Sequence, residues 1–188
     1  MKKVLTFDLD NTIFDTTPVF IEAFKRHNKE FYPSSDFNVR IAYPQDIAEE
    51  IIKLFSDNLW YNTSLLNDEV PYYINQLNDI YKIYYVSARN GKPESESQKQ
   101  LLRNNIRCNL EQIIKVSGNK IEALKNLKTT LHFDDSPHVI EACLKESINC
   151  HMISNEMMVY NHYLRNKVKH SKNLKEAIEI EKLLEKTK

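Results

Sequence analysis

Groups of reactive side chains follow three of the hydrophobic runs in this sequence. The groups are Asp8-Leu9-Asp10-Asn11-Thr12, Ser87-Ala88-Arg89 and Asp134-Asp135-Ser136. Lys120 lies between the second and the third group, where a helix is expected to begin. Carboxylates, a hydroxyl and an ammonium group can together perform acid–base and nucleophilic chemistry. Each group alone is common in loops, so their shared place at strand ends is the more specific signal.

The hydrophobic pattern predicts alternating strands and helices that position these groups. Strands are predicted at residues 4–9, 81–87, 113–116, 129–133 and 150–153, with a short segment at 168–171. Helices are predicted to begin near Pro18, Pro44, Asp68, Pro93, Asn119, Pro137, Glu156 and Leu174. Such alternation indicates an α/β fold with a doubly wound, Rossmann-like parallel sheet that is covered on both faces. Open sheets of this kind bind ligands at the carboxyl ends of their strands.

Residues 16–67 interrupt this alternation, because their patterns are helical only. We interpret them as a small α-helical cap inserted after the first strand, with residues 1–15 and 68–188 forming the core. Roughly half of the aromatic residues fall in or beside this insertion. Most should form the cap's own core, and the others could line a pocket above the strand ends. The candidates for substrate contact are Tyr43, Trp60 and Tyr61.

Taken together, the motifs resemble those of the haloacid dehalogenase-like (HAD) phosphatase superfamily. The matching residues are Asp8 to Thr12, Ser87, Lys120 and Asp134-Asp135. The resemblance covers the chain outside the cap and implies a phosphoric monoester hydrolase. Relatives with helical caps include deoxyribonucleotidases, sugar-phosphate phosphatases and phosphomutases, and the nucleotidase type is our working hypothesis.

The resemblance implies separate roles for the two acids of the first motif. Asp8 is the expected nucleophile, which would form an aspartyl-phosphate. Asp10 would protonate the leaving oxygen and later activate water. Two carboxylates two residues apart can face one phosphate if the chain turns sharply after the first. An acid at the position of Asp10 favours phosphoester hydrolysis over dehalogenation.

Several further groups are expected to bind the phosphate. Lys120 supplies positive charge to the phosphate and to Asp8, and Ser87 can donate a hydrogen bond beside the Ala88 N–H. Asn11 belongs to the same set, and Thr12 is expected to form a hydrogen bond within the turn that holds Asp10. The expected phosphate-binding residues are Asn11, Thr12, Ser87, Ala88, Arg89 and Lys120. For Arg89 two alternatives are open: a bidentate bond to a second phosphate or a carboxylate, and an ion pair with a neighbouring helix.

Acids gathered at one edge of the sheet would repel one another unless a cation joined them. Mg²⁺ suits such a set of oxygen ligands. The resemblance implies Asp8, the backbone carbonyl of Asp10 and Asp135 as ligands, with Asp134 acting through water, and the order of these two adjacent acids stays open. His132 and His138 flank the acids and could support them, but we prefer to interpret them as isolated surface or core histidines.

The leading hypothesis is an Mg²⁺-dependent phosphomonoester hydrolase for a small metabolite such as a nucleoside monophosphate. The alternatives are a phosphotyrosine protein phosphatase, a polynucleotide 3′-phosphatase, a mutase and a non-catalytic phospho-ligand binding module. Retention of both Asp8 and Lys120 disfavours the binding module.

The composition excludes several other classes. The chain has 188 residues, enough for one compact core, and its 26 basic residues balance 26 acidic ones, so non-specific nucleic-acid binding is not expected. Two glycines are too few for a P-loop or a dinucleotide-binding turn. The three cysteines form no CxxC pair and are expected to be reduced and buried. No apolar run reaches the length of a membrane span, and we expect a cytoplasmic protein.

Overall fold

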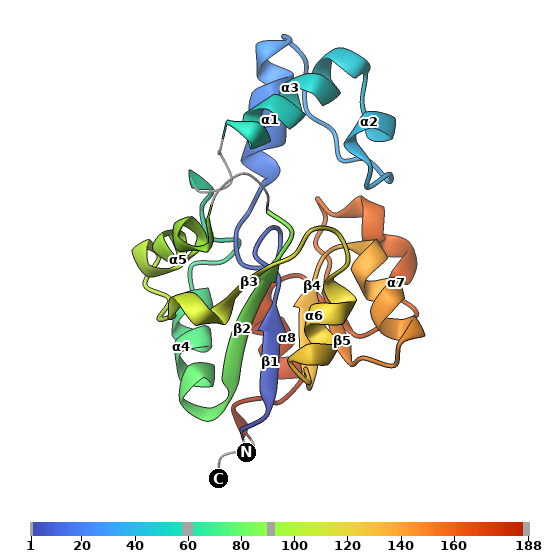
Figure 1. Ribbon diagram of the computed structural model, residues 1–188. Helices are drawn as coiled ribbons and strands as arrows, with labels where there is room; N and C mark the ends of the chain where they lie inside the picture. Colours follow the sequence, from blue (N-terminus) through green and yellow to red (C-terminus); the bar gives the residue numbers. More distant parts are fainter. Residues whose placement is uncertain (1, 58–61, 90–92, 186–188) are drawn as a thin grey trace.

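A computed structural model describes residues 2–57, 62–89 and 93–185 of the chain. It contains one sheet of six parallel strands in the order β3-β2-β1-β4-β5-β6 (Figure 1). The strands are β1 Val4–Phe7, β2 Lys82–Ser87, β3 Ile113–Lys115, β4 Leu131–Asp134, β5 Cys150–Ile153 and β6 His170–Ser171. This topology confirms the predicted doubly wound α/β class. The chain places β2 and β3 on one side of β1 and then β4, β5 and β6 on the other, so the switch point lies between β1 and β4.

Helices cover both faces of the sheet. They are α4 Val70–Ile80, α5 Glu94–Arg103, α6 Lys120–Asn126, α7 Pro137–Lys145 and α8 Leu174–Ile180, with 3₁₀ turns η2 Leu110–Gln112 and η3 Val159–Leu164. Apolar residues of α4, α5 and α8 form one buried cluster with β1 and β2. Those of α6 and α7 form a second cluster with the opposite side chains of β2 and β5. The central strands are therefore buried on both faces, as their continuous hydrophobic sequences predict.

The central pair of strands is fixed by aromatic packing as well as by the backbone ladder. Phe7 of β1 lies opposite Tyr85 of β2 on one side and Phe133 of β4 on the other. The rings of Phe7 and Phe133 are stacked, with centroids 4.8 Å apart. All three rings are buried. Because this pairing fixes the register of β1 and β4, it also fixes where the acids at their ends meet.

Three helices stand beyond the carboxyl edge of the sheet (Figure 1): α1 Thr17–Arg26, α2 Val39–Ala42 and α3 Gln45–Ser56. We call them the helical cap. Buried residues of α1 and α3, among them Phe24 and Ile51, form an apolar cluster separate from the two clusters of the sheet. Pro18 lies in the first turn of α1 and Pro44 precedes α3, as the sequence predicts. The division of the chain at residues 16 and 67 stays a prediction.

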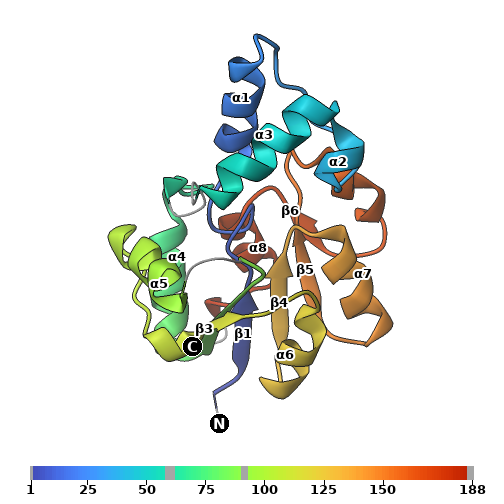
Figure 2. The ribbon, with the colours of Figure 1, turned by 45° about the horizontal axis from the view of Figure 1, so that its top comes forward.

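The two connections between the cap and the sheet run side by side. The amide of Asp15 donates to the carbonyl of Ser64, and the amide of Leu66 donates to the carbonyl of Ile13. Figure 2 shows the cap raised above the sheet on these connections. The cap is therefore joined to the sheet through a short paired segment.

Most predicted elements are found within a few residues of their expected positions, with two differences. The four-residue helix α2 was not predicted, and its residues have no buried side chain that could give a periodic pattern. The segment predicted as a helix near Glu156 is the 3₁₀ turn η3. Cys108, Cys143 and Cys150 are buried free thiols, as predicted. Among the described residues, no helix has the length and apolar character needed to cross a membrane.

Candidate active site

The loop after β1 carries the first two acids. The amide of Asp8 donates to the carbonyl of Phe133 at 2.9 Å, which ties the start of this loop to β4. The amides of Ile13 and Phe14 both donate to the carbonyl of Leu9, so the chain turns back sharply after the first acid. Asn11 takes up the left-handed conformation that this turn requires, with a φ of 55°, and asparagine tolerates that conformation better than most residues.

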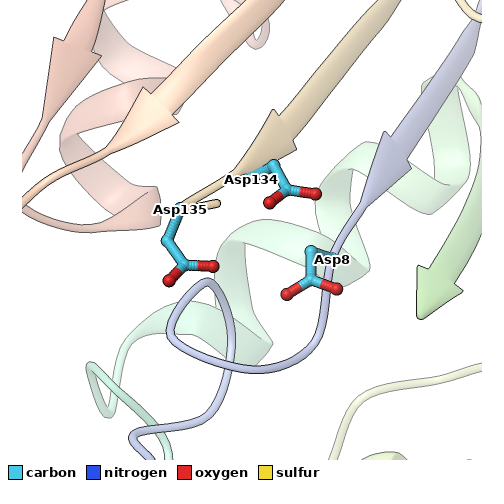
Figure 3. Close-up of side chains that lie close together, drawn as sticks. All are labelled: Asp8, Asp134 and Asp135. Atoms are coloured by element: carbon cyan, nitrogen blue, oxygen red, sulfur yellow. The ribbon is translucent and has the colours of Figure 1, made fainter. Parts of the chain in front are cut away.

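Three buried carboxylates from β1 and β4 converge at the carboxyl edge of the sheet (Figure 3). One oxygen each of Asp8, Asp134 and Asp135 lies within 4.8 Å of the others. Asp8 directly follows β1, whereas Asp134 ends β4 and Asp135 comes next. The adjacency of β1 and β4 thus places the first and the third sequence motif together, as the strand-end pattern predicts.

Lys120 is the cation of this cluster. Its Nζ lies 2.5 Å from Oδ1 of Asp8 and 2.7 Å from Oδ2 of Asp134. The side chain of Asn119 accepts a hydrogen bond from the amide of Ile121. This bond stabilises the N-terminus of α6, which begins at Lys120. Burial alone would lower the pKa of the ammonium group, but the two carboxylates outweigh it and raise the pKa above its usual value. Lys120 is therefore charged at neutral pH.

Asp134 is held on both oxygens. Lys120 and the ring of His132 contact Oδ2, the latter at 3.0 Å, and the amide of Ser136 donates to Oδ1 at 2.8 Å. Burial would raise the pKa of Asp134, but Lys120 and His132 outweigh it and lower the pKa to about 2. His132 also contacts Thr6 of β1. The interpretation of His132 as an isolated histidine is wrong, because its ring bridges β1 and this carboxylate.

Asp135 is held by the segment that follows β5. The hydroxyl of Tyr160 donates to Oδ2 of Asp135 at 2.5 Å, and the side-chain amide of Asn161 donates to its backbone carbonyl at 2.8 Å. The ring of Tyr160 packs against Phe37 of the cap segment. Sequence reasoning missed Tyr160 and Asn161, because no local pattern distinguishes them. Both lie on η3, which only the tertiary fold brings to the end of β4.

The charge balance of the cluster fits a bound cation. Burial raises the pKa of Asp8 to about 7, because Lys120 offsets only part of the burial effect and the other acids add to it. The pKa of Asp135 is likewise raised well above its ordinary value, by burial and by the negative charges of Asp134 and Asp8. One ammonium therefore does not neutralise three carboxylates in this site. A hard divalent cation with oxygen ligands would supply the missing positive charge.

Asp10 does not join the three clustered acids. Its carboxylate is bound by Arg89, with Nε 2.8 Å from Oδ2 and Nη2 2.7 Å from Oδ1. Of the alternatives for Arg89, a bidentate bond to a carboxylate is the contact present, and Nη1 also bonds Gln100 of α5. Ser87 accepts a hydrogen bond from the amide of Arg89, which shapes the turn after β2.

The remaining residues of the first motif have different surroundings from those predicted. Thr12 is buried, and its hydroxyl has no hydrogen-bond partner among the described residues, so the predicted bond that holds Asp10 is wrong. Arg89 holds Asp10 instead. The side chain of Asn11 accepts hydrogen bonds from the amide and hydroxyl of Thr16, just before α1, and donates to Tyr160. Asn11 therefore links the loop after β1 to the cap.

A cavity of about 470 Å³ lies between the acids and the cap. Its core side includes Asp8, Asp10, Asn11, Ala88, Arg89, Lys120, Asp134 and Asp135. Its cap side includes Phe20, Phe37, Val39 and Phe55. The volume falls in the range of small-molecule sites. His138 is exposed, lines this cavity and contacts Phe37 edge-on, with ring centroids 5.5 Å apart.

Of the aromatic residues predicted to contact substrate, only Tyr43 lies in the described part of the chain, and it does not line this cavity. Tyr43 packs edge-on against Phe24, with ring centroids 5.3 Å apart, and does not line the cavity above the acids. Trp60 and Tyr61 lie outside the described residues. Among the described residues, the aromatic side chains that line the cavity on its cap side are Phe20, Phe37 and Phe55. The sequence contains the right kind of residue in the cap, but not the information on which faces of its helices point toward the sheet.

No protein-family model matches this chain, and no curated protein matches it in sequence. Solved structures of low sequence identity do match. A HAD hydrolase of family IA, variant 3, from Entamoeba histolytica is 18% identical with a TM-score of 0.62, over 98% of each chain. A provisionally assigned HAD hydrolase from Bacillus subtilis, solved with magnesium bound, is 16% identical with a TM-score of 0.59, over 95% of this chain and 98% of that one.

A third similar structure carries a more specific description. It is a provisionally assigned phosphoglycolate phosphatase from Lactobacillus plantarum, 13% identical with a TM-score of 0.58, over 96% of this chain and 99% of that one. This chain therefore has the fold of the HAD-like hydrolases. The likeness confirms the resemblance that the motifs indicated, at the level of the fold.

Proposed function

We propose that this protein is an Mg²⁺-dependent phosphomonoester hydrolase that acts through an aspartyl-phosphate on a small metabolite. The observation that carries the proposal is the buried pair of Asp8 and Lys120, which faces a cavity of small-molecule size together with Asp10. The phosphatase description of one similar structure and the magnesium in another support the same reaction class.

Asp8 is the proposed nucleophile. Lys120 donates to its Oδ1, and among the described residues Oδ2 accepts no side-chain hydrogen bond, so that oxygen can attack phosphorus. The attack forms the bond between Oδ2 and phosphorus and breaks the ester bond, while Asp10 gives a proton to the departing oxygen. In the second half-reaction Asp10 takes a proton from water, and the water oxygen attacks phosphorus. The bond between Oδ2 of Asp8 and phosphorus breaks, which releases inorganic phosphate and regenerates the Asp8 carboxylate.

Several groups would stabilise the phosphoryl oxygens during transfer. Lys120 would contribute a full positive charge, and the Ser87 hydroxyl and the Ala88 amide would contribute hydrogen bonds. The residues that fit Mg²⁺ are Asp8, Asp135 and the backbone carbonyl of Asp10, with Asp134 held in place by Lys120 and His132. When bound, Mg²⁺ would neutralise charge on the phosphoryl oxygens.

A nucleoside monophosphate is the proposed substrate class. The phosphate would occupy the acidic and basic end of the cavity, and a planar base could stack on Phe20, Phe37 or Phe55 at the other end. The cap above the acids favours a small ester over a phosphoprotein or a polynucleotide end, because a large substrate needs an open groove. A cytoplasmic location and the nucleotidase subtype remain predictions.

A screen of phosphomonoesters with Mg²⁺ tests the proposal. Nucleoside monophosphates, sugar phosphates, phosphotyrosine and a 3′-phosphorylated oligonucleotide would be compared by kcat/KM. The Asp8→Asn protein serves as the control for contaminating phosphatases. Highest kcat/KM for a nucleoside monophosphate would support the full proposal, and highest kcat/KM for another small ester would support only the reaction. No Mg²⁺-dependent turnover above the Asp8→Asn control would overturn it.

A further inference from the structure

Arg89 binds both oxygens of the Asp10 carboxylate. Two parallel hydrogen bonds of 2.8 and 2.7 Å join the guanidinium to both oxygens of the carboxylate. The Arg89 side chain is fully buried, while that of Asp10 is 18% exposed toward the cavity. The guanidinium also lies over the ring of Phe14, 5.5 Å from its centroid. A planar fork held on several sides fixes the orientation of the carboxylate. It leaves each oxygen a second lone pair, where Asp10 can carry the proton that it gives to the leaving oxygen.

The same guanidinium is connected to the cap. Its Nη1 donates to Oε1 of Gln100 at 2.6 Å, and the amide nitrogen of Gln100 donates to both the carbonyl and the hydroxyl of Thr63. Thr63 lies in the connection that returns from the cap to the sheet, next to Ser64, which pairs with Asp15 of the outgoing connection. A continuous chain of hydrogen bonds therefore runs from the Asp10 carboxylate to the paired connections of the cap.

We propose that Arg89 is a positioning residue that aims the Asp10 carboxylate at the leaving oxygen of the substrate. Gln100 and Thr63 hold the guanidinium against the cap connections, so the acid keeps its orientation relative to both the sheet and the cap. This proposal rests on the proposed phosphatase function, because it assigns Arg89 to the proton transfers of Asp10. It differs from the expectation that Arg89 binds the phosphate directly.

The leaving group of the substrate distinguishes the two roles. Protonation by Asp10 matters greatly for a poor leaving group such as an alkyl alcohol and little for 4-nitrophenolate. The experiment measures kcat/KM for an alkyl phosphate and for 4-nitrophenyl phosphate, since kcat/KM reports the step that transfers the phosphoryl group to Asp8. The variants are Arg89→Met and Arg89→Lys, and Arg107→Met is the matched control because Arg107 is exposed and pairs with Asp79 instead.

We expect Arg89→Met to lower kcat/KM for the alkyl phosphate about 10–100-fold, with a much smaller loss for 4-nitrophenyl phosphate. The loss should be smaller than the about 10²–10⁴-fold contribution of general acid–base catalysis, because Asp10 itself is still present. Arg89→Lys should restore part of the loss, because lysine supplies charge without the fork. In an Asp10→Asn background, Arg89→Met should have little further effect, since the group that it positions is gone. Circular dichroism and thermal unfolding monitor folding, and Arg89→Lys carries the test if Arg89→Met does not fold.

Three results would overturn the proposal in distinguishable ways. An equal loss for both esters, through a raised KM and also in the Asp10→Asn background, would show that Arg89 binds phosphate directly. Absence of hydrolysis by the unmodified protein would remove the proposed function and this inference with it. Unchanged kinetics of the Arg89 variants in an active enzyme would remove the inference alone.

Discussion

The hydroxyl of Tyr160 donates a hydrogen bond to Oδ2 of Asp135, and the ring that carries it packs against Phe37 with centroids 5.2 Å apart. One side chain thus contacts both a proposed Mg²⁺ ligand and the cap. Asn11 donates a hydrogen bond to the same hydroxyl, so Tyr160 cannot reorient without disturbing the loop that carries Asp8 and Asp10. Tyr160 therefore connects the acidic cluster to Phe37, which lines the cavity above it.

Tyr160→Phe should weaken Mg²⁺ binding about 10–100-fold, as is usual for partners that orient a metal ligand. The hydrogen bond from Tyr160 favours the ionised form of Asp135, and only the ionised form binds the metal. Mg²⁺ titration by calorimetry, with half-saturation of activity as a second measure, checks this. Tyr163→Phe is the matched control, because Tyr163 is exposed and its hydroxyl bonds Glu141. Equal Mg²⁺ affinities in the two variants would contradict the prediction.

Asp8→Asn should abolish turnover and retain the fold, because the change is nearly isosteric and removes the nucleophilic oxygen. Asp10→Asn should cost less for good leaving groups than for poor ones. Phosphatase assays with 4-nitrophenyl and alkyl phosphates, together with circular dichroism, check both expectations. Near-normal kcat in the Asp8→Asn protein would rule out covalent catalysis at this residue.

Without metal, Asp8 should make the folded protein less stable as the pH rises. Its pKa is about 7 in the folded chain and near 3.8 when unperturbed, so between these values the folded state holds a proton that the unfolded state has lost. The contribution of Asp8 to the free energy of unfolding is therefore greatest at low pH and declines as the pH rises toward and through 7. The Asp8→Asn protein lacks this titration.

The difference in Tm between Asp8→Asn and the unmodified protein in chelator measures the effect of Asp8. The Tm of Asp8→Asn, relative to the Tm of the unmodified protein, should rise from pH 5 to pH 8. His151 opposes the trend, because burial lowers its pKa, but it is present in both proteins and cancels in the comparison. Mg²⁺ should stabilise the unmodified protein more at pH 8 than at pH 5. A difference in Tm that does not depend on pH would contradict the assignment of this titration to Asp8.

Phe37→Ala should raise KM for the best nucleotide substrate by roughly 10–150-fold, the equivalent of about 1–3 kcal/mol for one base–aromatic contact. It should change kcat little, because the reacting groups belong to the core. Tyr32→Ala is the control within the cap, because Tyr32 is exposed and contacts Phe24 and Tyr43 rather than the cavity. Kinetics on the nucleotide and on a small aryl phosphate check this. If KM for the nucleotide is unchanged in Phe37→Ala, the base is bound elsewhere.

The strand ends could be predicted because their signals are local. A short β-prone run followed by acids marks both β1 and β4, and the general rule for parallel sheets then brings Asp8, Asp134 and Asp135 to one edge. Lys120 could be predicted in the same way, from its place at the start of a helix. None of these steps requires knowledge of which helix packs against which strand.

The partners of these acids could not be predicted, because they depend on tertiary packing. His132 and Tyr160 reach Asp134 and Asp135 through the strand order and the path of η3, neither of which is encoded in a local pattern. The pairing of Arg89 with Asp10 depends in the same way on β2 lying beside β1. For Thr12 the residue type predicts a hydrogen bond that the structure does not contain. Its hydroxyl is buried and has no hydrogen-bond partner among the described residues.

The neighbouring strands β1 and β4 are distant in the sequence, and this separation has a kinetic consequence. Lys120 of α6 bonds both Asp8, after β1, and Asp134, at the end of β4. Lys120 and Asp8 are 112 positions apart. Contacts between such distant residues slow folding, because the intervening chain loses freedom when they form. An ion between Asp8 and Asp135 needs the ends of both strands in place, so we expect it to bind after the transition state. Mg²⁺ should lengthen the lifetime of the folded chain while leaving the rate of its formation nearly unchanged.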